Sequence, residues 1–189
     1  QSVSVVGREE LDDRKALKVD EALLYTAGVS AQTFGPDPDT DWFFIRGFQA
    51  TQTGVFLDGL SLYAYGFGGF QVDAFTLERI EVLKGPASVL YGGANPGGII
   101  NLVSKRPTDD PFGYFEAGIN NWGNGYAALD FGDAIGTSGK WSYRVTGRVA
   151  GGDQFTDVSE DFRGVIMPQL TYRPSDGTRL TLHGQYAAL

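Results

Sequence analysis

The stretch LERIEVLKGPASVLYG, residues 77–92, contains a strand, a break and a short helix in direct succession. Ile80–Leu83 has the β-branched and apolar composition of a strand. Gly85 and Pro86 end that strand, and a proline at the first position of a helix needs no amide donor. We therefore predict a one- or two-turn helix over Pro86–Tyr91, ended by the glycines that follow it.

The rest of the first half has the same mixture of short elements. Lys18–Thr26 carries apolar residues at helical spacing and is followed by Gly28, which predicts a short helix. Further strands are predicted at Ser2–Val6, Val29–Phe34, Trp42–Arg46, Gly54–Leu57 and Gly98–Val103. Residues 1–107 are therefore expected to form a compact α+β domain with a short mixed sheet and short helices.

After residues 107–111 the pattern changes to a strict alternation of polar and apolar residues. Between residues 140 and 150, one face of the predicted strand carries Trp141, Tyr143, Val145, Gly147 and Val149. The alternation returns at 163–173 and 179–188, with weaker versions at Tyr114–Asn120 and Gly125–Asp130. Residues 108–189 therefore predict about five antiparallel strands.

Two interpretations of these strands remain open. An ordinary antiparallel sheet would cover a soluble core with its apolar face. The strands are also long enough to cross a bilayer obliquely, and short turns alternate with a longer polar loop, as in outer-membrane barrels. Aromatic residues near the strand ends favour this second interpretation: Trp122, Trp141, Tyr143, Tyr172 and Tyr186. Five strands cannot close a barrel, so it also predicts that the chain is a fragment.

Charge and composition exclude several classes of function. The 189 residues carry 15 basic and 23 acidic side chains, a net charge of −8, which argues against a nucleic-acid partner held by bulk charge. The chain has no cysteine and one histidine, His183, which excludes thiolate sites and metal clusters built from several histidines. G-x-S-x-G, P-loop and H-E-x-x-H motifs do not occur, so we expect no enzyme.

Four blocks of sequence resemble one family: residues 77–92, IRGF at 45–48, FLDGL at 56–60 and NPGGIINLVSKRP at 95–107. They are similar to the plug domain of TonB-dependent outer-membrane receptors, particularly ferric-siderophore transporters of the ferrichrome and ferrioxamine type. In that family the plug fills a barrel of about 22 strands. The resemblance implies a plug over 1–107, followed over 108–189 by the first five or so antiparallel strands of a transmembrane β-barrel.

The resemblance places residues 31–70 in plug loops that face the outside. Arg46 is the only basic residue between Val19 and Glu78, whereas this stretch is rich in rings and holds several aspartates. An apex without a spare cation favours a neutral or cationic chelate, such as a ferric trihydroxamate, over an anionic one. At the position of an apical arginine in the ferrichrome type this chain has Phe34. The candidate ligand-binding residues are Phe34, Trp42, Gln52, Tyr63, Tyr65, Phe67 and Phe70. The siderophore's own oxygens satisfy the iron, so no cofactor or protein metal site is expected.

A second set of candidates concerns contacts between the plug and the barrel. Arg46, Glu78, Arg79 and Lys84 alternate with apolar residues, so their charges are expected to leave the plug core. They would face either water or the barrel wall. The resemblance implies that Arg46 and Lys84 pair with carboxylates of the wall and seat the plug.

The expected function is energy-coupled uptake of a ferric siderophore across the outer membrane of a Gram-negative bacterium. The resemblance implies three partners: the siderophore, outer-membrane lipid, and TonB with its inner-membrane energising complex, acting at the periplasmic N-terminus. Ser2–Val6 would be the first plug strand. The alternatives are the same fold with another cargo (haem, cobalamin or oligosaccharide) and a soluble β binding module.

Overall fold

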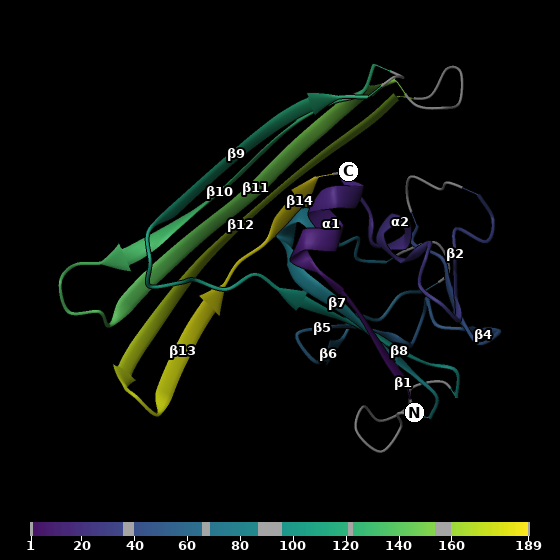
Figure 1. Ribbon diagram of the computed structural model, residues 1–189, viewed down its shortest axis with the longest axis horizontal. Coiled ribbons are helices and arrows are strands. Elements are labelled where there is room, and N and C mark those ends of the chain that lie inside the picture. The colour runs from purple at the N-terminus through teal and green to yellow at the C-terminus, as the bar shows by residue number, and fades with distance from the viewer. Residues whose placement is uncertain are drawn as a thin grey trace. The chain divides into compact units, whose positions relative to one another are not determined.

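The computed structural model describes residues 2–35, 40–65, 69–86, 96–120, 123–153 and 160–188. The chain divides into two compact units, Gln1–Lys105 and Arg106–Leu189 (Figure 1). No helix among the described residues has the length and apolar character needed to cross a membrane.

The first unit is built on two small sheets. The larger has the strand order β1-β7-β8-β5-β6 and consists of β1 (Ser2–Gly7), β5 (Val55–Leu57), β6 (Leu60–Ser61), β7 (Leu77–Lys84) and β8 (Gly98–Ser104). Its strands pair antiparallel except β5 and β8, which are parallel. The smaller antiparallel sheet is formed by β2 (Val29–Ala31), β3 (Phe43–Ile45) and β4 (Phe48–Gln49). The helices are α1 (Arg8–Arg14), α2 (Val19–Leu23) and the 3-10 turn η1 (Ala74–Thr76).

The core of this unit lies over the central strands of the larger sheet. β8 is buried along nearly its whole length because it pairs with a strand on each side. This burial explains why most of its residues are apolar. Buried side chains of α1, α2 and β3 join the same core, among them Leu11, Val19, Leu23, Phe43 and Ile45. Each such side chain stabilises the fold by about 1.5–3 kcal/mol.

β7 and β8 approach one another closely at Gly98. This glycine has a φ of +138°, and a Cβ atom there would lie 2.1 Å from the carbonyl oxygen of Leu83. Only glycine fits this position, because the neighbouring atom belongs to the backbone and cannot rotate away.

The predicted elements of the first unit are largely confirmed, with shifted boundaries. β7 begins earlier and β2 ends earlier than predicted, and the expected helix at Lys18–Thr26 is the shorter α2. Helix α1 was not predicted, because Leu11 is its only apolar residue and no helical spacing of apolar residues marks it. Ion pairs between Arg8 and Asp12 and between Glu10 and Arg14 connect successive turns of α1. The predicted helix at Pro86–Tyr91 lies mostly outside the described residues.

The second unit is an antiparallel sheet of long strands with the order β13-β12-β11-β10-β9. Its strands are β9 (Phe112–Ile119), β10 (Gly125–Ile135), β11 (Trp141–Asp153), β12 (Glu160–Ser175), β13 (Thr178–His183) and β14 (Tyr186–Ala188). The segment predicted as one strand over 179–188 is divided into β13 and β14, which both pair with β12. Between them the amide of Gly184 donates to the carbonyl oxygen of Pro168 at 3.1 Å.

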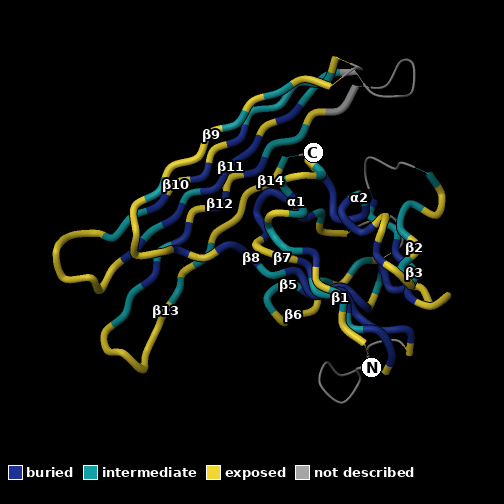
Figure 2. Tube along the Cα trace, viewed as in Figure 1, coloured by how far each residue is buried: buried dark blue, intermediate teal, exposed yellow. Residues whose placement is uncertain are grey.

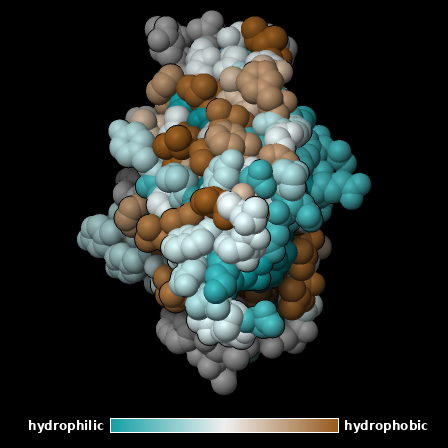
Figure 3. All heavy atoms as spheres, turned by 90° about the vertical axis from the view of Figure 1, so that its left-hand side faces the viewer, coloured by the Kyte–Doolittle hydropathy of each residue, from teal (hydrophilic) through white to brown (hydrophobic). Residues whose placement is uncertain are grey.

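The two faces of this sheet have the reverse of a soluble protein's polarity. Along β11 the polar residues Ser142 and Thr146 are buried, at 1% and 0% exposure, whereas Trp141 and Val149 are 39% and 45% exposed. Buried and exposed residues alternate along the long strands (Figure 2), and apolar residues lie at the surface among polar ones on the side of the molecule seen in Figure 3. A sheet that exposes its apolar residues suits a lipid-facing wall, which decides between the two interpretations in favour of the barrel.

Candidate ligand-binding site

Three aromatic rings form a cluster around β3. Phe34 meets Trp42 edge to face at a centroid distance of 5.2 Å, and it meets Phe44 at 6.4 Å. Because side chains alternate along a strand, Trp42 and Phe44 share the half-buried face while Phe43 and Ile45 point into the core. Phe34 itself is 69% exposed, so the cluster presents an aromatic surface to solvent.

The other candidate rings that the structure describes lie in the segment that follows β6. Tyr63, Tyr65 and Phe70 are among the most exposed large side chains, at 64%, 81% and 78%. The amide of Ala64 donates to the carbonyl oxygen of Gln52 at 3.4 Å, which ties the two tyrosines to the Gln52 turn.

The structure thus brings Phe34 and Trp42 into contact and leaves Tyr63, Tyr65 and Phe70 accessible. Phe67 lies outside the described residues. Phe44 was absent from the predicted set, although its spacing from Trp42 places both rings on one face of β3. The role of these residues in ligand binding stays a prediction.

A pocket lies beside these segments in the first unit. Its lining is largely apolar and includes Phe43, Val55 and Phe70, with polar groups from Thr40, Asp41, Thr51 and Gln71. Among the lining residues that the structure describes, Asp41 alone is charged.

A buried charge cluster adjoins the pocket, and sequence analysis did not predict it. The ammonium group of Lys18 lies 3.4 Å from Asp20 Oδ2 and 3.3 Å from Asp41 Oδ1. Burial, together with the nearby charge of Asp20, raises the pKa of Asp41 to about 7, although the positive charge of Lys18 opposes the change.

Among the predicted plug–barrel residues, Arg46 and Lys84 make side-chain contacts with β1. Arg46, at a positive φ of 52°, donates to Ser2 Oγ at 3.4 Å. Lys84 donates to Ser4 Oγ at 2.7 Å and is only 7% exposed. The expectation that the charge of Lys84 leaves the plug core is therefore wrong. The aliphatic stem of Lys84 lies beside Gly28 and its ammonium group finds a hydroxyl acceptor, which permits burial.

The two remaining candidates are Glu78 and Arg79, on β7. Glu78 is exposed, and Arg79 Nε pairs with Glu81 Oε1 at 2.7 Å. Burial raises the pKa of Glu81, but hydrogen bonds from Asn101 and Arg79 outweigh this and lower it overall. Pairing of these residues with a surrounding wall remains a prediction.

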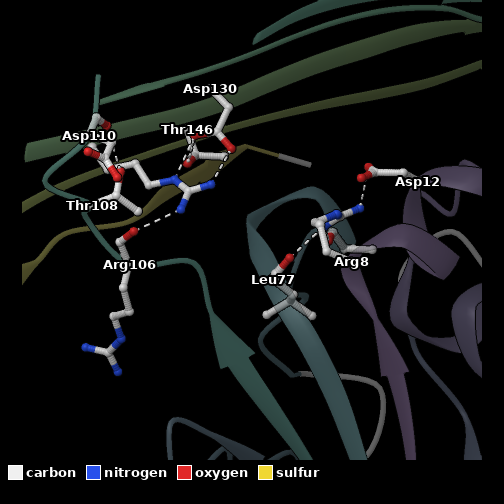
Figure 4. A network of polar contacts seen from close by, with 10 residues as sticks. Arg8, Asp12, Leu77, Arg106, Thr108, Asp110, Asp130 and Thr146 are labelled. Atoms are coloured by element: carbon white, nitrogen blue, oxygen red, sulfur yellow. Dashed lines mark hydrogen bonds and ion pairs between the residues drawn. The ribbon is translucent and has the colours of Figure 1, made fainter. Parts of the chain in front are cut away.

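In the second unit, a polar network covers part of the buried face. Arg144 donates through Nε and Nη2 to both carboxylate oxygens of Asp130, at 2.8 and 2.7 Å, and Thr146 donates to Asp130 Oδ1 at 3.1 Å. The third guanidinium nitrogen donates to the carbonyl oxygen of Arg106 at 2.9 Å (Figure 4). The network gives the buried guanidinium group its hydrogen-bond acceptors, which a polar side chain needs when it is removed from water.

A second arginine anchors the first unit. Arg8 donates to the carbonyl oxygens of Ala74 and Leu77, at 3.0 and 2.6 Å, and pairs with Asp12 (Figure 4). This side chain therefore fixes the start of α1 to the segment that enters β7.

Comparison with known proteins defines the class. The family described as TonB-dependent Receptor Plug Domain matches residues 1–99, and the chain belongs to this family. The family resemblance and the fold predicted from the sequence are thus confirmed, and the chain is part of an outer-membrane protein of a Gram-negative bacterium.

Individual relatives are transporters and receptors. The chain is 40% identical to the ferrichrome outer membrane transporter/phage receptor of Escherichia coli K12 and to the ferrioxamine receptor of Yersinia enterocolitica. Each alignment covers 96% of this chain but only 24% and 26% of those proteins, so the chain spans about a quarter of their length. The pyoverdine outer membrane receptor of Pseudomonas aeruginosa PAO1, solved with bound pyoverdine, is similar with a TM-score of 0.87 and 27% identity. That match covers 99% of this chain and 27% of the receptor.

Proposed function

We propose that the protein containing this chain takes up a ferric siderophore, of the hydroxamate type, across the outer membrane in a TonB-dependent manner. The observation that carries the proposal is an exposed aromatic surface without a spare cation, on a plug domain. Arg46 is the only basic residue between Val19 and Glu78, and its guanidinium contacts Ser2.

The chemistry of the chelate agrees with this surface. A trihydroxamate supplies all six oxygens to ferric iron and carries no net negative charge, so recognition depends on shape, aromatic contact and a few hydrogen bonds. Two of the relatives carry ferrichrome and ferrioxamine in their names, which supports the same ligand class here. In the described part of the chain, no cluster of three or more His, Cys, Asp or Glu is arranged to hold a metal ion. Iron is proposed to enter only as the chelate, because the siderophore's own oxygens satisfy its coordination.

The energy source is proposed to act through the N-terminus. β1 is the edge strand of its sheet, and Val6 is its only buried hydrophobic residue. A pulling force that TonB applies upstream of Ser2 would act on β1 before the other strands of the sheet.

Uptake and binding by the complete receptor test the proposal. A strain whose only receptor is this protein should grow under iron limitation on ferrichrome or ferrioxamine B, and should stop when TonB is deleted. The matched controls are an anionic ferric catecholate, haem and cobalamin. Growth on the catecholate, haem or cobalamin in place of the hydroxamates would overturn the assigned cargo. Uptake without TonB would overturn the energy source.

A further inference from the structure

Lys18, Asp20 and Asp41 form a cluster with unequal charges. Two carboxylates share one ammonium group, and the side chains of Lys18, Asp20 and Asp41 are 8%, 0% and 14% exposed. A buried cluster with a surplus negative charge is costly, because water is not available to solvate it. Binding one proton removes the surplus.

The hydrogen bonds distinguish the two carboxylates. Asp20 Oδ1 accepts from the amide of Glu21 at 2.8 Å, and Asp20 Oδ2 accepts from Lys18 Nζ. Asp41 Oδ1 lies within ion-pair distance of the same ammonium group, but the buried oxygen has no hydrogen bond of acceptable geometry. The proton is therefore best held by Asp41, since each oxygen of Asp20 already has a donor.

Few other charges face Asp41. Among the described residues, Asp20 and Lys18 of α2 are the charged groups that act on it, and the pocket on its other side is lined by uncharged residues. Glu21 of the same helix accepts from the amides of Leu17 and Lys18, so its carboxylate is used to begin α2.

The cluster is connected to the aromatic surface through the backbone. Lys18 Nζ also donates to the carbonyl oxygen of Thr40 at 3.1 Å, so α2 holds the chain on both sides of the Thr40–Asp41 peptide. The next residue is Trp42, whose ring contacts Phe34. A change in the charge of the cluster therefore acts directly on the segment that places Trp42.

We propose that Lys18, Asp20 and Asp41 form a buried proton-binding site that positions Trp42 and, through it, the Phe34 ring. With the proton bound, the cluster is neutral and holds the entry to β3 against α2. When the proton leaves, the surplus charge weakens that attachment, and the aromatic surface loses its arrangement. The link to siderophore affinity rests on the proposed function, whereas proton binding itself does not.

The complete receptor, with aspartate carboxyl groups labelled with ¹³C, tests the proton directly. Infrared difference spectra between about pH 6 and about pH 8 should show a protonated carboxyl band that titrates near neutrality. Asp41→Asn should remove this band, and Lys18→Gln should raise its midpoint by about one pH unit, because a neighbouring positive charge is lost. The exposed Glu78→Gln variant is the matched control and should leave the band in place. A titrating band that survives in Asp41→Asn, or a spectrum without any such band, would overturn the proposal.

Two further measurements separate the proton site from the cargo. The fluorescence difference between the wild-type receptor and Trp42→Phe isolates Trp42, and it should follow the same midpoint without any siderophore. A signal that follows sodium or potassium concentration rather than pH would overturn the proposal in favour of a metal cation.

With ferrichrome as the probe, the Kd should rise about threefold to tenfold between about pH 6 and about pH 8, and Asp41→Asn should abolish this dependence. Absence of ferrichrome binding at every pH would contradict the proposed function and leave the titration of Trp42 intact.

Discussion

Arg144 and Asp130 face one another across β11 and β10 as a two-point ion pair, with both carboxylate oxygens accepting from the guanidinium at 2.7–2.8 Å. Both side chains are nearly buried, at 11% and 5% exposure. Removing either partner leaves the other charge without compensation in a place that water does not reach.

Arg144→Met should therefore lower the free energy of unfolding of the receptor by about 3–5 kcal/mol. The matched control is Arg79→Met, which breaks the exposed pair with Glu81 and should cost about 0–1 kcal/mol. Denaturant unfolding of the purified, detergent-solubilised receptor measures both. Replacing both charges, Arg144→Met with Asp130→Leu, should cost less than Arg144→Met alone. An equal loss of unfolding free energy in Arg144→Met and Arg79→Met would contradict the prediction that burial makes the Arg144–Asp130 pair the more important one.

The second prediction concerns Gly98. Gly98→Ala places a methyl group 2.1 Å from the Leu83 carbonyl oxygen and in a left-handed backbone conformation, so β7 and β8 must separate. We expect the free energy of unfolding of the first unit to fall by more than about 2 kcal/mol. Faster proteolysis of this unit in the intact receptor measures the change. Gly7→Ala is the control, because a Cβ atom at Gly7 meets nothing within 4 Å. Similar proteolysis of the two variants would show that the close approach at Gly98 is relieved at little cost.

The third prediction separates the two serine contacts of β1. Ser4→Ala removes the acceptor of the buried Lys84 ammonium group and should weaken the attachment of β1 by about 1–2 kcal/mol. Ser2→Ala removes only the long, exposed contact with Arg46 and should have a much smaller effect. Amide hydrogen exchange of Ser2–Gly7 in the complete receptor measures both changes. Faster exchange in Ser2→Ala than in Ser4→Ala would reverse the assignment of the stronger contact.

The strands were predictable where burial imposes composition. β8 is mostly apolar because it is the middle strand of its sheet, and the alternations of β7 and β11 follow from the different burial of their two faces. The direction of that alternation could not be predicted from the strand alone, because Trp141 and Ser142 alternate identically whether the apolar face meets a core or lipid. The buried polar residues of β11 show that its polar face is the buried one and its apolar face the exposed one.

The candidate site was predictable only in part. Phe34 and Trp42 could be proposed because the family resemblance places them in loops that face the outside, where aromatic rings can contact a ligand. The cluster of Lys18, Asp20 and Asp41 could not, because it joins residues of α2 to a segment about 20 residues away, and no local pattern specifies that contact. Lys84 was wrongly expected outside the core for the same reason: its acceptor, Ser4, lies at the other end of the unit's sequence.

The fourth prediction concerns the aromatic surface. Trp42→Ala removes the ring that contacts Phe34 and should weaken binding of ferrichrome by the complete receptor about tenfold or more. Phe115→Ala, at an exposed ring of the second unit, is the control and should leave the Kd unchanged. Isothermal titration of the detergent-solubilised receptor gives both constants. An unchanged Kd in Trp42→Ala would remove this ring from the ligand site.

The last prediction is the dependence of stability on pH. In the folded protein the pKa of Asp41 is raised from 3.8 to about 7, so the folded state binds a proton more tightly than the unfolded chain. The stability that this proton contributes is complete below about pH 4 and is lost as the pH rises through about 7. Asp41→Asn keeps a neutral side chain throughout, so its stability relative to the wild type should increase over this range, by about 4 kcal/mol at most. Unfolding midpoints of the two receptors at a series of pH values measure the difference. A constant difference from about pH 4 to about pH 8 would mean that Asp41 stays ionised in the folded protein, compensated by Lys18 alone.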